Sequence, residues 1–65
     1  MRLKRIIIYT KDVQRITGKS ERYGRQLIRN IKSHLNKKDH QYITIDEFAD
    51  YTGLNPLEVE EFITD

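Results

Sequence analysis

Residues 10–35 read TKDVQRITGKSERYGRQLIRNIKSHL and decide the fold. We expect a short helix over residues 10–17, a turn at Gly18-Lys19, and a longer helix that is capped by Ser20 and ends near Leu35. Two helices joined by a glycine-containing turn are typical of the helix-turn-helix motif, in which the second helix reads DNA.

The two faces of the longer predicted helix differ in chemistry. One face carries small and apolar residues at helical spacing: Gly24, Leu27, Ile28, Ile31 and Leu35. The opposite face carries polar and cationic residues: Arg22, Tyr23, Gln26, Arg29 and Asn30. Because glycine costs about 1 kcal/mol relative to alanine in mid-helix, we expect Gly24 to mark a close approach to the first helix around Val13.

Charge is sorted along the chain of 65 residues. Residues 1–38 hold all 12 Lys and Arg and two acids, a balance of +10, whereas residues 39–65 hold eight acids and no Lys or Arg, a balance of −8. Surface ion pairs contribute only about 0–1 kcal/mol each, so stability is a weak reason for this sorting. A basic surface that meets a polyanion is the favoured interpretation, and mutual neutralisation of the two halves is the alternative.

A second unit of the same kind is predicted over residues 41–65. Thr44 and Glu47 have the spacing of a capping box, with Ile43 and Phe48 as its hydrophobic staple. Asn55 and Pro56 begin a last helix. Phe48 and Tyr51 are the apolar pair of its first helix, and Leu54 and Val59 would staple the last helix. The expected buried face of that last helix consists of Val59, Phe62 and Ile63.

The two units align at an offset of 35 residues, which matches Thr17-Gly18 to Thr52-Gly53. Residues 6–9 and 41–44 read as strands. We therefore expect one mainly α domain over residues 1–65, with a basic helix-turn-helix unit (6–35) and an acidic helix-turn-helix-like unit (41–65). About four helices and a short two-stranded antiparallel ribbon would form a winged-helix-like arrangement.

Residues 10–22, with Leu27-Ile28, resemble the helix-turn-helix of excisionase and MerR-type DNA-binding domains, and that of short bacterial helix-turn-helix proteins. The resemblance covers about residues 9–35. It implies DNA contacts just after the turn, at Lys19, Ser20, Arg22, Tyr23, Gln26 and Arg29. The family usually carries a larger apolar residue in place of Gly24. The sequence shows no counterpart of the MerR coiled-coil or effector domain, so no small-molecule ligand is implied.

The residue types separate base contacts from phosphate contacts. Arg22 and Gln26 can make bidentate hydrogen bonds to guanine and adenine edges. The other cations are expected on phosphates, or else as solvated surface charges: Lys11, Arg15, Lys19, Arg25, Arg29, Lys32, Lys37 and Lys38. The matching positions of the acidic unit carry carboxylates, which phosphate would repel. There Leu57, Glu58 and Glu61 form a candidate protein contact, and a stray exposed leucine is the alternative.

Other classes of function find little support in the sequence. There is no cysteine, and His34 and His40 do not have metal-ligand spacing, so no metal or cofactor is expected. No nucleophile–base or acid–base pair points to an enzyme. The apolar run at residues 6–9 is too short to cross a membrane, and a cytoplasmic location is expected.

We therefore expect a sequence-specific DNA-binding protein, either a transcriptional regulator or an excisionase-like factor. Its partner is double-stranded DNA, bound as a homodimer or cooperative array because one small module buries little surface. The alternative is a protein–protein interaction module that uses the segregated basic and acidic halves.

Overall fold

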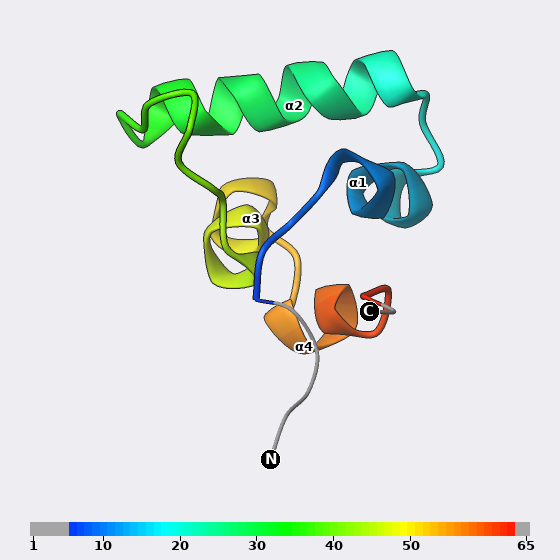
Figure 1. Ribbon diagram of the computed structural model, residues 1–65. Helices are drawn as coiled ribbons and strands as arrows, with labels where there is room; N and C mark the ends of the chain where they lie inside the picture. The colour runs from blue at the N-terminus through cyan, green and yellow to red at the C-terminus, as the bar shows by residue number, and fades with distance from the viewer. Residues whose placement is uncertain (1–5, 64–65) are drawn as a thin grey trace.

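A computed structural model of the protein describes residues 6–63, and in that range the chain forms four helices. They are α1 (Thr10–Thr17), α2 (Glu21–His34), α3 (Ile45–Thr52) and α4 (Pro56–Glu60). Helix α2 runs along one side of the molecule, α1 and α3 lie beneath it, and α4 lies on the opposite side (Figure 1). The prediction of a mainly α fold with about four helices is confirmed.

The helix boundaries follow from local capping chemistry. The Tyr23 N–H donates to Ser20 Oγ at 3.1 Å and begins α2. In the Thr44–Glu47 capping box, the Glu47 N–H donates to Thr44 Oγ1 at 3.1 Å and the Thr44 N–H donates to Glu47 Oε1 at 2.9 Å. Gly18 and Gly53 end α1 and α3 with φ of 72° and 80°, in the left-handed region that glycine adopts without strain.

Equivalent interactions recur at the offset of 35 residues. The Asp12 carboxylate accepts the Tyr9 N–H at 2.8 Å, as Glu47 accepts that of Thr44. Thr17 Oγ1 donates to the Val13 carbonyl at 2.7 Å, and its counterpart Thr52 donates to the Phe48 carbonyl at 2.8 Å. The shared contacts support the interpretation of two units built on one pattern.

The predicted two-stranded ribbon does not form within residues 6–63. The predicted winged-helix-like arrangement depended on that ribbon and is therefore not supported. The two segments meet at one isolated antiparallel bridge, between Ile7 and Thr44. The Ile8 N–H donates to the Ile43 carbonyl at 2.9 Å, and the Ile45 N–H donates to the Ile6 carbonyl at 2.8 Å. The pairing stops there because Tyr9 and Thr44 are already the N-caps of α1 and α3, so each chain turns into a helix.

The core lies where both units meet. Its buried apolar residues are Ile8, Val13, Ile31, Ile43, Ile45, Phe48, Ala49, Val59 and Ile63, and Ile16, Leu27 and Ile28 pack against them. A Cβ on Gly24 would lie 3.0 Å from Thr10 Cγ2 and 3.6 Å from Val13 Cβ, which confirms the predicted close approach of α2 to α1.

Two expected apolar packing positions of the acidic unit are wrong, because Tyr51 and Phe62 are exposed. Helix α4 ends at Glu60, so Phe62 lies beyond the helix whose buried face was expected to contain it. Leu35 is also exposed, since α2 ends one residue before it. None of the helices in the described range combines the length and apolar character needed to cross a lipid bilayer.

Candidate nucleic-acid interface

The outer face of α2 is open to solvent, as predicted. Arg22, Tyr23, Gln26, Arg29 and Asn30 are all exposed, whereas Gly24 and Ile31 on the opposite face are buried. The packing of Gly24 against α1 and of Ile31 in the core fixes the rotation of α2 about its axis. The same packing therefore directs the cationic side chains outward.

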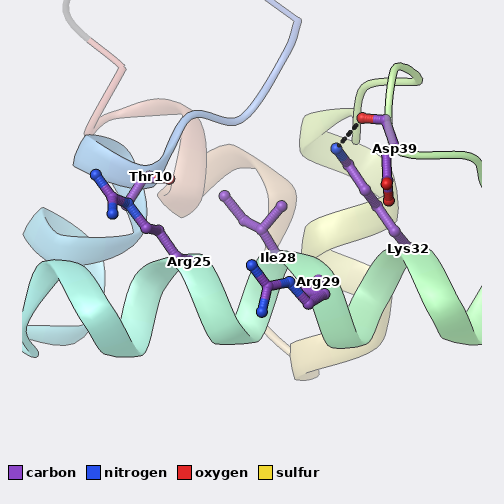
Figure 2. A pocket seen from close by; sticks show the side chains of 6 residues that line it. All are labelled: Thr10, Arg25, Ile28, Arg29, Lys32 and Asp39. Atoms are coloured by element: carbon purple, nitrogen blue, oxygen red, sulfur yellow. Dashed lines mark hydrogen bonds between the residues drawn. The ribbon is translucent and has the colours of Figure 1, made fainter.

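The cations of this face differ in how firmly they are held. Within residues 6–63, Arg22 and Arg29 make no ion pair. Arg25 pairs with Glu21 one turn earlier, and both side chains are exposed. Lys32 Nζ donates to the Asp39 carbonyl at 2.8 Å, which ties the end of α2 to the following loop (Figure 2). Arg22 and Arg29 are thus the cations best placed to meet an outside anion.

Two shallow hollows with cationic rims follow one another along α2. The first is lined by Glu21, Arg22, Arg25, Gln26 and Arg29. The second is lined by Thr10, Arg25, Ile28, Arg29, Lys32 and Asp39 (Figure 2). Both share Arg25 and Arg29, so the structure brings four of the sequence-predicted cations into one stripe along the helix: Arg22, Arg25, Arg29 and Lys32.

Four further residues predicted to contact DNA lie just before α2 or in its first two turns. Ser20 Oγ accepts the Tyr23 N–H, so this hydroxyl has a structural role at the helix start. Lys19 Nζ lies 5.7 Å from the centroid of the exposed Tyr23 ring, a cation–π distance. Gln26 Nε2 donates to Asn30 Oδ1 at 2.9 Å, which orders the amide on the outer face.

The cations of α1 lie beside partners of their own. Lys11 Nζ lies 6.0 Å from the Tyr9 ring centroid, and Arg15 Nη1 lies 3.6 Å from Asp12 Oδ1. Both cations are exposed, whereas Asp12 is fully buried. The burial of this carboxylate was not predicted, although Asp12 follows Tyr9 at the same spacing of three residues at which Glu47 follows Thr44.

The predicted phosphate contact of Lys37 requires an exposed side chain, but most of this side chain is covered. Its side chain is 21% exposed, and its Nζ lies 3.0 Å from Glu47 Oε1 and donates to the Tyr42 carbonyl at 2.8 Å. The hydrogen bond from the Thr44 N–H, together with Lys37, lowers the pKa of Glu47 against the opposing effect of burial. We therefore leave Lys37 out of the candidate interface. The neighbouring Lys38 is exposed and stays in it.

The predicted protein-contact residues lie away from the stripe. Leu57, Glu58 and Glu61 are exposed at α4, on the side of the molecule opposite α2 (Figure 1). His34 stacks edge-on against Tyr51, with ring centroids 5.3 Å apart. No group of three or more metal-ligating side chains occurs in the part of the chain that the structure describes.

The α2 face therefore combines arginines that can make bidentate contacts, an amide at helical spacing, and flanking lysines. Its cations can hold successive phosphates of a polyanion. Arg22 and Gln26 lie one helical turn apart on the same face. No protein family, curated protein or solved structure matches this chain.

Proposed function

We propose that this protein is a sequence-specific DNA-binding protein, acting as a transcriptional regulator or an excisionase-like factor, and that it places the outer face of α2 in a major groove. The observation that carries the proposal is the orientation of that face. Arg22, Gln26 and Arg29 are exposed together, and neither arginine has an ion-pair partner in residues 6–63.

The dimensions of α2 suit a groove. A helix of 14 residues is about 21 Å long, and the major groove, about 12 Å wide, admits one helix. Arg22 and Gln26 lie one turn apart and have the donors and acceptors to read guanine and adenine edges. The stripe formed by Arg25, Arg29 and Lys32 would then meet phosphates, which position the helix without specifying sequence.

The distribution of charge supports the same orientation. With α2 on the DNA, the carboxylates of α4 lie on the far side, where phosphate does not repel them. One module of this size covers little DNA, since single modules bury about 600–1,000 Å². A homodimer or a cooperative array therefore remains part of the proposal.

The experiment is a fluorescence-anisotropy titration of random-sequence duplex DNA at about 50 and 200 mM salt. Binding should weaken as salt rises, because cations that neutralise phosphates release counterions. Arg29→Ala should reduce the slope of log K against log salt by about one. Asp50→Asn, which removes an exposed charge on α3 and not on α2, serves as the control and should leave the slope unchanged.

Salt-insensitive binding, or Arg22→Ala/Arg29→Ala binding as tightly as the wild type, would refute the proposal. A pool of random duplexes selected on the protein and sequenced then identifies the site. Loss of a single preferred base in Arg22→Ala selections would assign that base to Arg22.

A protein-interaction role is the second candidate, and the exposed Leu57, which is followed by the exposed Glu58 and Glu61, favours it. Arg22→Glu/Arg29→Glu separates the two functions. Lost DNA binding by a folded monomer supports the DNA-binding role, whereas altered self-association with unchanged DNA binding supports the interaction role.

A further inference from the structure

We infer that copies of this protein associate head to tail, with Leu57 and the adjacent carboxylates of one copy seated in the α2 hollow of the next. We further infer that DNA competes for the same hollow. The competition rests on the proposed function, whereas the association between copies does not.

Leu57 provides an apolar projection on α4. Its side chain is 66% exposed, the highest value among the large apolar residues that the structure describes. Glu61 lies four residues on, at the spacing of neighbours on a helix surface, and Glu58 follows Leu57 directly; both are exposed at the same end of the molecule. An exposed leucine framed by carboxylates is suited to a receptor that is apolar at its base and cationic at its rim.

The hollow beside α2 has that composition. It is an open hollow of about 290 Å³, and Ile28 projects from α2 between Arg25 and Lys32 (Figure 2). Arg25, Arg29 and Lys32 form the cationic wall. Asp39 is the one acid among the described lining residues. Its carbonyl holds Lys32 Nζ at 2.8 Å, and the wall keeps an excess of two positive charges over this carboxylate.

A second copy is the occupant that the charges favour. The basic and acidic regions lie on opposite sides of one molecule, so one copy cannot bring Leu57 to its own hollow (Figure 1). A two-fold symmetric contact through α4 would place carboxylates against carboxylates. Contact between α4 of one copy and α2 of the next pairs opposite charges instead, and such a heterologous interface builds open chains of molecules.

The contact uses the cations that the proposed DNA interface also uses. Arg25 and Arg29 line both hollows of α2 and cannot meet phosphates and the carboxylates of another copy together. DNA, with its higher charge density, should therefore displace the α4 end of the neighbouring copy. In the absence of DNA, the protein would then be self-associated, with its DNA-binding face covered.

Sedimentation velocity tests the association, at about 0.1–1 mM protein and low ionic strength. The weight-average sedimentation coefficient of the wild type should rise with concentration, and added salt should reverse the rise. Leu57→Ser should weaken the association at least tenfold. Ile6→Ser is the matched control because Ile6 is equally exposed, at 65%, and lies outside both surfaces; it should sediment as the wild type does.

Mixing two variants tests the head-to-tail geometry. Leu57→Ser keeps an intact α2 hollow, whereas Arg25→Glu/Arg29→Glu keeps an intact α4 end. Each variant alone should remain monomeric, and an equimolar mixture should form dimers and nothing larger. A wild type that stays monomeric over the whole range, a Leu57→Ser variant that associates normally, or a mixture that stays monomeric would each overturn the inference.

A short random duplex added to the associated wild type tests the competition. Protein–DNA complexes should replace the protein assemblies, and Leu57→Ser should bind the duplex at least as tightly as the wild type. Association without any DNA binding would refute the proposed function and leave the contact between copies standing. DNA binding that leaves the assemblies intact would refute the competition.

Discussion

Replacing Glu47 by alanine removes two contacts between the loop after α2 and the start of α3. The Thr44 N–H loses the carboxylate that it meets at 2.9 Å, and Lys37 loses the carboxylate that lies 3.0 Å from its Nζ. Lys37 keeps the Tyr42 carbonyl as its acceptor. The capping box becomes a single hydrogen bond, from the Glu47 backbone N–H to Thr44 Oγ1.

The size of the effect follows from these contacts. A hydrogen bond to a charged group contributes about 1.5–3 kcal/mol, and a partly exposed ion pair contributes about 0–1 kcal/mol. Because both side chains retain access to water, we take values near the lower ends and expect Glu47→Ala to lower the free energy of unfolding by about 2 kcal/mol. For a domain of this size that corresponds to a fall in Tm of roughly 8–16 °C.

Glu47→Gln separates the hydrogen bond from the charge. The amide oxygen can still accept the Thr44 N–H, but the attraction to Lys37 is lost, so we expect a loss of about 1 kcal/mol. Asp50→Ala is the matched control, because Asp50 is an exposed acid on the same helix. It should change the stability by less than about 0.5 kcal/mol.

The pH dependence supplies an independent check. The pKa of Glu47 in the folded protein lies below its ordinary value of 4.5. A lowered folded-state pKa means that the stabilisation is fully present above the unfolded value and is lost as pH falls from there through the folded value. Wild-type stability should therefore fall more steeply below pH 4.5 than that of Glu47→Gln.

Urea unfolding followed by circular dichroism measures both effects. The reasoning would be refuted by a Glu47→Ala variant within 0.5 kcal/mol of the wild type, the size of an ordinary surface effect. Parallel pH curves for the wild type and Glu47→Gln would likewise show that the carboxylate is not stabilised by folding.

Three further substitutions test the fold around α2, each by urea unfolding. Gly24→Val should destabilise by about 1–3 kcal/mol, because its Cβ would lie 3.0 Å from Thr10 Cγ2 and 3.2 Å from the Thr10 carbonyl. Gly18→Ala should cost about 1–2 kcal/mol through its φ of 72° alone, since no atom lies within 4 Å of the added Cβ, and Gly18→Asn should cost less. Ser20→Ala should cost about 1 kcal/mol, whereas Ser20→Asp should keep the stability and weaken DNA binding in the anisotropy assay.

Features set by a few neighbouring residues could be predicted from the sequence. Ser20, Thr44 and Asn55 start helices because their side chains accept backbone N–H groups two or three residues ahead. The outward face of α2 was predictable for a related reason, since helical spacing alone separates Arg29 from Ile31. Gly24 pointed to the contact with α1 because its cost in mid-helix needed an explanation.

Features set by contacts between distant segments could not be predicted from the sequence. The β-branched residues at 6–9 favour a strand, but Tyr9 caps α1 and leaves room for one bridge only. Lys37 has the same side chain as Lys38, and only the folded position of Glu47 makes one of them a partly exposed ion pair while the other is exposed. The exposure of Phe62 likewise depends on where the short α4 ends.

The cationic stripe on α2 also destabilises the helix, because its like charges repel one another. Arg22, Arg25, Arg29 and Lys32 follow at spacings of three, four and three, so three like-charge neighbour pairs arise. Each pair destabilises a helix by about 0.2–0.5 kcal/mol. Glu21 offsets this at Arg25 only, and its own pair is exposed. A glutamate at position 29 would instead attract both cationic neighbours, Arg25 and Lys32, and would thereby stabilise the helix. An arginine at this position is the arrangement expected of a surface whose charge is neutralised by an outside anion. Arg29→Glu should therefore stabilise the free protein while abolishing DNA binding.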